Sequence, residues 1–259
     1  MAIIPVKGMT LNVRCDGDRG RPTVVLSNSL GTDLSMWDAQ VAVLATRFHV
    51  VRYDTRGHGA SGAPTGPYTI AQLGSDVLGL LDHFDIQRAH FIGLSMGGVI
   101  GQWLGAHAGE RLDKLVLANT ASKIGTREGW QARASAVRAS GMGEIAAGSP
   151  ARWFTPDFIA RQPVVVGMMQ KTVRALNPEG YAACCDALAV ADLTGDIQAI
   201  GSRTLVIAGA DDPVTTVADA RTLAAAIDGA TLATLPASHL SNVEAPDRFT
   251  DAVVSFLLA

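Results

Sequence analysis

The stretch that decides the fold is His90-Phe91-Ile92-Gly93-Leu94-Ser95-Met96-Gly97-Gly98. It consists of a short apolar run, a serine between two glycines, and the start of a helical segment. This G-x-S-x-G spacing is typical of a sharp strand-to-helix turn, in which the serine has strained backbone angles and small neighbours let the chain pass close by. We therefore expect the Ser95 hydroxyl at the carboxyl end of a sheet, beside the free N–H groups of a helix N-terminus.

Apolar runs alternate with helical segments on both sides of this turn. Residues 69–84 carry apolar side chains at helical spacing. Strands are expected at residues 11–14, as part of an N-terminal hairpin, and at 23–27, 48–53, 115–118, 204–208 and 231–235. Strands that alternate with helices predict an α/β fold with a mostly parallel central sheet flanked by helices.

The alternation stops between residues 119 and 200, where helical patches are interrupted by prolines and aromatic residues. We predict a helical cap of residues 120–200, inserted after the sixth strand into a core of residues 1–119 and 201–259. Residues 120–180 contain eight Lys or Arg and four Asp or Glu, a net of +4, so the rest of the chain carries −7 of the total of −3. A basic cap over an acidic body favours a small anionic substrate, although solvated helix faces would give the same excess.

Composition narrows the class of protein. The chain has 259 residues, of which 48% are hydrophobic and 17% charged, as expected for one large globular α/β domain with an insertion. A sequence pI near 6.0 gives no indication of a nucleic-acid partner. No apolar run approaches the ~20 residues that span a bilayer, and the N-terminus lacks the pattern of a signal peptide. We expect neither a nucleic-acid nor a membrane partner.

The cysteines and histidines indicate the compartment and exclude a metal site. Cys15, Cys184 and Cys185 are odd in number and include an adjacent pair, which suits a reducing cytoplasm better than a disulfide framework. The histidines are scattered, no H-E-x-x-H is present, and the cysteine pair lacks zinc spacing. We expect a cytoplasmic protein without metal or other cofactor.

A serine hydroxyl is a poor nucleophile near neutral pH, so Ser95 needs a base, and the base needs an orienting acid. Two turns that follow expected strands offer these groups. Asp211 and Asp212 lie in one turn and His239 in the other. Because the carboxyl ends of parallel strands meet at one edge of a sheet, both turns should lie beside Ser95. His239 would take the serine proton, and one of the two aspartates would fix the histidine tautomer.

With these residues assembled, the chain resembles an α/β-hydrolase throughout. The resemblance implies the chain order serine, acid, histidine. Members usually place the acid directly before a proline such as the one here, which favours Asp212 over Asp211; Asn119, at the other position such enzymes use, is not a carboxylate. The resemblance also implies an oxyanion hole formed by the main-chain N–H groups of Met96 and of Leu30, the latter in the loop after an early strand.

More narrowly, the chain is similar to the 3-oxoadipate enol-lactonases of bacterial aromatic-compound catabolism. The most specific segments are residues 26–32 and 36–38, where Asn28-Ser29 stands in place of a commoner His-Gly pair. That departure should affect substrate contacts more than chemistry, so Ser29 is an expected substrate contact. Other segments fit the family but are shared with esterases and perhydrolases: residues 54–62, 93–98 and 209–215.

This resemblance implies the opening of 3-oxoadipate enol-lactone by water, with Ser95 as the nucleophile. The substrate carries a free carboxylate, and because burying that charge without a partner is costly, the pocket should supply a cation. We predict that Arg133 in the cap does so, with Trp130 one helical turn earlier as a wall. Arg138 and Arg152 are alternative cations, and Trp153 is a second possible wall.

Other functions remain open, among them a carbon–carbon bond hydrolase of the same fold, whose nucleophile is also a serine. A general carboxylesterase or a cofactor-free perhydrolase would use the same three catalytic residues and fold, but would not need a cationic cap. A non-catalytic small-molecule receptor can also be built on a hydrolase fold, although an intact set of Ser95, Asp212 and His239 favours an enzyme. Rates on a neutral ester and on the enol-lactone separate a carboxylesterase or perhydrolase from a lactonase. Acylation of Ser95 separates an enzyme from a receptor.

Overall fold

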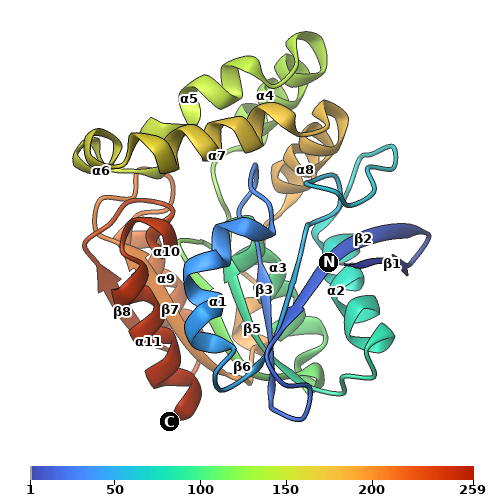
Figure 1. The fold of residues 1–259 in the computed structure, drawn as a ribbon, viewed down its shortest axis with the longest axis vertical. Helices are drawn as coiled ribbons and strands as arrows, with labels where there is room; N and C mark the ends of the chain where they lie inside the picture. The colour runs from blue at the N-terminus through green and yellow to red at the C-terminus, as the bar shows by residue number, and fades with distance from the viewer. Residues whose placement is uncertain (1) are drawn as a thin grey trace.

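The computed structural model describes residues 2–259 and contains one sheet of eight strands in the order β1-β2-β4-β3-β5-β6-β7-β8 (Figure 1). β1 and β2 form an antiparallel hairpin, β2 also runs antiparallel to β4, and every other neighbouring pair is parallel. The sheet is therefore mostly parallel, as the alternation of strands and helices predicts. The strands are β1 (Ala2–Val6), β2 (Met9–Asp16), β3 (Thr23–Ser27), β4 (His49–Tyr53), β5 (Ala89–Leu94), β6 (Leu112–Ala118), β7 (Arg203–Gly209) and β8 (Thr231–Leu235).

Helices cover both faces of the sheet. In Figure 1, α1 and α11 lie in front of the sheet and contact each other, while α3 lies behind it and contacts α2. The helices outside the 120–200 segment are α1 (Asp38–Leu44), α2 (Ile70–His83), α3 (Met96–His107), α9 (Val217–Ala226), α10 (Ser241–Glu244) and α11 (Pro246–Leu258), with short 3-10 turns at Leu34–Trp37 and Gly109–Arg111. A further 3-10 turn, Ile197–Ala199, lies near the end of the 120–200 segment.

Five helices occupy the connection between β6 and β7. They lie together across one end of the sheet, at the top of Figure 1, and we refer to them as the cap helices. They are α4 (Arg127–Ser140), α5 (Gly143–Trp153), α6 (Pro156–Arg161), α7 (Pro163–Ala175) and α8 (Pro178–Val190). Within this layer α4 packs on α8 and α5 packs on α7. The connection follows the sixth strand, where the sequence predicts an insertion.

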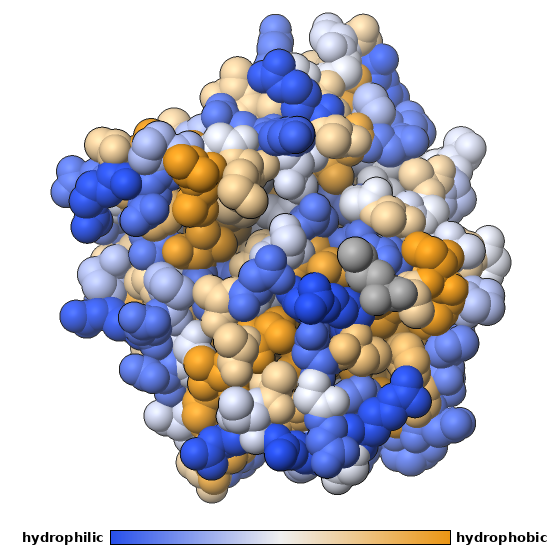
Figure 2. All heavy atoms as spheres, in the orientation of Figure 1, coloured by the Kyte–Doolittle hydropathy of each residue, from blue (hydrophilic) through white to orange (hydrophobic). Residues whose placement is uncertain are grey.

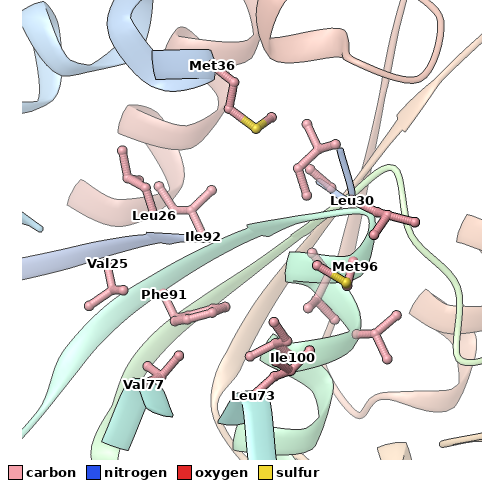
Figure 3. Packing of buried hydrophobic residues seen from close by; sticks show 14 of the residues in the cluster. Val25, Leu26, Leu30, Met36, Leu73, Val77, Phe91, Ile92, Met96 and Ile100 are labelled. Atoms are coloured by element: carbon pink, nitrogen blue, oxygen red, sulfur yellow. The ribbon is translucent and has the colours of Figure 1, made fainter. Parts of the chain in front are cut away.

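The central strands are buried on both faces, which explains why their sequences are mostly apolar. Every residue of β3, β4 and β5 is buried. Successive side chains point to opposite faces: Val25 and Phe91 point toward α2 and α3, whereas Leu26 and Ile92 point to the other side (Figure 3). The core therefore lies in two layers, one on each face of the sheet.

Local signals place the element boundaries close to the expected ones. The helix expected at 69–84 is α2, which begins after Thr69. The Thr69 side chain accepts from the Gln72 N–H, and the Gln72 side chain accepts from the Thr69 N–H, so that the two residues form a capping box. The strand expected at 115–118 begins three residues earlier, at Leu112. Both differences lie at element ends, where a sequence pattern carries least information.

The surface in the orientation of Figure 1 is mixed in character. Hydrophilic residues are spread along its rim, including the outer ends of the cap helices, and apolar residues show in separate small groups (Figure 2). Val164 and Met168 of α7 are the most exposed large apolar side chains of the described residues. Within residues 2–259, every helix is too short or too polar to cross a lipid bilayer.

The turn between β5 and α3 depends on glycine. Ser95 has φ 57° and ψ −115°, a strained conformation for a residue with a side chain. A Cβ atom on Gly93 would collide with the carbonyl oxygen of Gly97, and one on Gly97 would collide with the carbonyl oxygen of Ser27. A Cβ atom on Gly98 would lie 2.6 Å from the Thr120 side chain. The tight turn thus forms only because the three glycines let neighbouring chain segments approach.

We predict that Gly98→Ala lowers the free energy of unfolding by about 1–3 kcal/mol, because the added methyl group overpacks the contact with Thr120. Gly167→Ala is the matched control: Gly167 lies in α7, and a methyl group added there would have no neighbouring atom within 4 Å. The control should leave stability unchanged or raise it by about 0.5–1 kcal/mol. Urea unfolding of both variants measures this, and equal stabilities would contradict the packing argument.

Candidate active site

Ser95 is held at the carboxyl edge of the sheet by its own main chain. Its N–H donates to the carbonyl oxygen of Ala118 at 2.9 Å, and its carbonyl oxygen accepts from Thr120 Oγ1 at 2.9 Å. These two bonds join the turn after β5 to the end of β6. The Ser95 side chain lines a cavity of about 410 Å³ that lies between the strand ends and the cap helices.

His239 lines the same cavity and is bonded to Asp212. The two side chains come from the turns after β8 and β7, and His239 Nδ1 lies 2.8 Å from Asp212 Oδ2. Both residues are buried. Because Asp212 accepts at Nδ1, the opposite ring nitrogen, Nε2, is the one free to take a proton. The structure thus brings together two of the three predicted catalytic residues by a direct bond and places the third in the same cavity.

The carboxylate of Asp212 is fully hydrogen-bonded. Oδ1 accepts from the N–H groups of Val214 and Thr215 at 2.8 and 3.0 Å. Oδ2 accepts from Thr215 Oγ1 at 2.8 Å and from Asn119 Nδ2 at 3.0 Å, in addition to His239. Burial raises the pKa of Asp212, but the hydrogen bond and charge of His239, with the bonds from Asn119 and Thr215, outweigh burial and hold the pKa below its ordinary value.

The two neighbouring aspartates, of which the resemblance favours Asp212, differ in their surroundings. Asp212 is buried against His239, whereas Asp211 is exposed and its carbonyl oxygen accepts from Ser238 Oγ at 3.2 Å. Of the pair, Asp212 is therefore the one placed to orient His239.

The loop after β3 contributes to the lining of the same cavity. Ser29, Leu30 and Gly31 all line it. The N–H of Ser29 donates to Met36 Sδ and that of Gly31 to His58 Nε2, whereas among residues 2–259 no protein acceptor is found for the N–H of Leu30. Met96, the other predicted donor, is the first residue of α3, where a helix leaves its N–H free.

One expectation about this loop is wrong in part. We expected the Asn28-Ser29 pair to affect substrate contacts, and Ser29 does line the cavity. Asn28, however, points into the protein: its Nδ2 donates to the carbonyl oxygen of Tyr53 at 2.8 Å, and its Oδ1 accepts from Trp37 Nε1 at 2.9 Å. An amide can make both bonds at once, so Asn28 serves as an internal brace for the loop.

The cap side of the cavity is aromatic and cationic. Trp130, Arg133, Arg152 and Trp153 all line it. The Arg133 guanidinium carbon lies 4.7 Å from the ring centroid of Trp130, a cation–π contact. Burial lowers the pKa of Arg152, and the nearby positive charge of Arg133 lowers it further. The cavity lining contains no Asp or Glu.

Arg138, the other alternative cation, is not part of the cavity lining. Its Nε and Nη2 bond both carboxylate oxygens of Glu179 at 2.8 and 2.9 Å, and Nη2 also bonds Asp186 at 2.7 Å. The bonds to these two carboxylates raise the pKa of Arg138 above its ordinary value. Its charge is therefore neutralised on the surface between α4 and α8.

Sequence reasoning missed several residues that organise the site. Asn119 is not a carboxylate and so carries no predicted role, yet it has φ 45° and bonds both Asp212 and the carbonyl oxygen of Ser238. Tyr181 of α8 lines the cavity and is buried beside Arg133. The sequence signal for Asn119 is its position directly after a buried strand; no local pattern indicates Tyr181. Within residues 2–259, no three His, Cys, Asp or Glu side chains are grouped to bind a metal ion.

Comparison with known proteins agrees with this geometry. The model of the alpha/beta hydrolase family matches residues 24–252. The chain is 50% identical over 250 residues to 3-oxoadipate enol-lactonase 2 of Acinetobacter baylyi, covering 96% of this chain and 94% of that protein. It is 42% identical to 3-oxoadipate enol-lactonase 1 of the same organism, covering 97% and 94%. The crystal structure of the enol-lactonase from Burkholderia xenovorans superposes with a TM-score of 0.98 at 49% identity, covering 100% of both chains.

We predict that Asp212→Asn lowers kcat by about 10⁴-fold on any ester that Ser95 cleaves, because the amide no longer holds His239 in the required tautomer. Asp211→Asn is the matched control, since it changes the neighbouring exposed carboxylate in the same way; it should keep kcat within about twofold. Initial rates on p-nitrophenyl acetate measure both. A larger loss in Asp211→Asn than in Asp212→Asn would exchange the roles of the two residues.

Proposed function

The chain belongs to the alpha/beta hydrolase family, and from that premise and the geometry of the cavity we propose that it is a serine hydrolase that opens 3-oxoadipate enol-lactone to 3-oxoadipate. The observation that carries the proposal is the content of a single cavity: Ser95 and His239 lie on its core side, Arg133 and Arg152 on its cap side, and no carboxylate in the lining offsets the two cations. The high identity to two 3-oxoadipate enol-lactonases supports the choice of lactone.

In the proposed acylation step, Ser95 Oγ attacks the lactone carbonyl carbon while His239 Nε2 accepts the serine proton. The carbonyl oxygen becomes an oxyanion, which the N–H groups of Leu30 and Met96 stabilise. The bond between the carbonyl carbon and the ring oxygen then breaks. The ring oxygen leaves as an enolate that stays tethered in the acyl-enzyme, and His239 protonates it.

Deacylation uses the same groups. His239 removes a proton from water, the resulting hydroxide attacks the acyl carbon, and Ser95 leaves with the proton that His239 returns. The product has a new carboxylate in place of the lactone ester. Asp212 remains ionised throughout and stabilises the imidazolium at each stage, which agrees with the direction of its pKa.

The free carboxylate of the substrate is assigned to Arg133. A carboxylate buried without a partner is costly, and a hydrogen bond to arginine offsets that cost better than a neutral donor would. Arg133 is available because it lines the cavity, whereas Arg138 is paired with Glu179 and Asp186. Trp130 supports the guanidinium through its ring face, and Trp153 forms a second wall.

We assign substrate selection to residues 120–200 as a cap, and catalysis to a core of residues 1–119 and 201–259, because the cations come from the former and Ser95, Asp212 and His239 from the latter. A cytoplasmic location is the natural one for this chain, since Cys15, Cys184 and Cys185 are free thiols.

The proposal predicts that the purified protein consumes synthetic 3-oxoadipate enol-lactone and that Ser95→Ala reduces the rate by at least about 10³-fold, because the nucleophile is removed. The ultraviolet absorbance of the enol-lactone follows the reaction. Cleavage of p-nitrophenyl acetate without lactone turnover would point to a general carboxylesterase. Absence of turnover, together with failure of a serine-directed phosphonate to label Ser95, would point to a receptor.

We further predict that Arg133→Ala lowers kcat/KM for the enol-lactone by about 10- to 150-fold, mainly through KM, since a charge-assisted bond to the substrate carboxylate contributes about 1.5–3 kcal/mol. Activity on p-nitrophenyl acetate, which has no carboxylate, should remain within about twofold. Arg138→Ala is the matched control and should leave both activities unchanged. An unchanged KM for the lactone in Arg133→Ala would remove the assignment.

A further inference from the structure

We propose that His58 is a positioning residue for the oxyanion hole, an inference that rests on the proposed serine-hydrolase chemistry. His58 lies in the turn after β4, and its Nε2 accepts the main-chain N–H of Gly31 at 3.0 Å. Gly31 directly follows Leu30, whose N–H is the proposed oxyanion donor on this loop. The bond thus fixes the peptide between Leu30 and Gly31, next to the donor N–H of Leu30, although His58 itself does not contact the substrate.

The orientation of the His58 ring is set from several sides. Its Nδ1 lies 3.3 Å from the carbonyl oxygen of Arg56 and 4.0 Å from Cys184 Sγ. The Tyr181 ring packs beside it at a centroid distance of 6.2 Å. A carbonyl oxygen only accepts, so Nδ1 carries the hydrogen and Nε2 keeps the lone pair that Gly31 requires. Burial lowers the pKa of His58 to about 4, so the ring stays neutral near pH 7.

The turn that carries His58 is itself firmly held. Arg56 makes a bidentate ion pair with buried Asp76, at 2.7 and 2.6 Å. Gly57 has φ 79°, and its main chain packs so closely on Gly180 of α8 that a Cβ atom on Gly57 would lie 2.7 Å from the Gly180 Cα. The acceptor therefore has a fixed position relative to both the core and α8.

The turn from Ser29 to Thr32 is closed by the N–H and Oγ1 of Thr32, which both donate to the carbonyl oxygen of Ser29, but it is the bond to His58 that holds the N–H of Gly31. Gly31 has φ 89°, a conformation that glycine adopts freely, and it lies against the rings of Trp153 and Tyr181. Without an acceptor, its buried N–H would be unsatisfied and the peptide would turn to find one. Such a movement would displace the adjacent Leu30 N–H, and a displacement of about 1 Å in a catalytic group costs about 10²-fold in rate.

The test compares His58→Leu, which has no acceptor, with His58→Gln, whose Oε1 can stand in for Nε2 and accept from Gly31. Because an oxyanion donor acts in the transition state, His58→Leu should lower kcat by about 10- to 100-fold and leave KM within about twofold. His58→Gln should recover most of kcat. Rates are measured on neutral p-nitrophenyl acetate and on the enol-lactone, with circular dichroism to verify folding.

His49→Leu is the matched control. His49 is also a buried histidine with a side-chain hydrogen bond, to Thr23 Oγ1 at 3.3 Å, but it lies at the opposite end of β4. The His49→Leu variant should keep kcat within about twofold of the wild-type value, even if its melting temperature falls. Where His58→Leu does not fold, His58→Asn takes its place, because the shorter amide does not reach Gly31.

Equal kcat values in His58→Leu and wild type would overturn the proposal, as would an equal loss in His58→Gln and His58→Leu. A rise in KM without a fall in kcat would also overturn it. The neutral ester keeps this test separate from the choice of substrate: a protein that cleaves the ester but not the lactone refutes the lactonase proposal and still reports on His58.

Discussion

The structure depends on a backbone constraint, the strained turn at Ser95. A non-glycine residue at φ 57° and ψ −115° costs on the order of 1–3 kcal/mol and persists only where its surroundings enforce it. Here the enforcement comes from residues at the ends of two neighbouring strands, β3 and β6. The N–H of Ser95 bonds the end of β6, the N–H of Gly97 bonds the carbonyl oxygen of Asn28 after β3, and Thr120 bonds the carbonyl oxygen of Ser95. The same contacts bring together the loops that carry nucleophile and oxyanion donors.

Charge is distributed unevenly around the cavity, and the asymmetry follows from hydrogen bonding. The carboxylate bonded to His239, that of Asp212, has both oxygens occupied by donors. Arg133 and Arg152 at the cap end have no carboxylate partner in the lining. A negative ligand therefore finds uncompensated positive charge at one end of the cavity and a proton-transfer pair at the other, which suits an ester that bears a remote carboxylate.

The cap helices contact the core loops that carry the candidate catalytic residues. The carbonyl oxygen of Trp153 in α5 accepts from Leu240, the residue after the proposed base. Gly180 in α8 packs on the Gly57 turn, and Tyr181 of the same helix packs on His58. Substitutions in α8 thus act on the turn that supports the oxyanion loop, not only on the residues that line the cavity.

The sequence by itself indicated the class of fold, the family and a candidate nucleophile, because those depend on local patterns: apolar runs of strand length, a glycine-bounded serine, and polar residues directly after strands. It also placed Trp130 and Arg133 on one helix face, since helical spacing is a local rule. Only the tertiary structure bonded Asp212 to His239, turned Asn28 inward, neutralised Arg138, and brought His58 to Gly31. Each of these depends on contacts between residues far apart in the chain, whose partners no local pattern specifies.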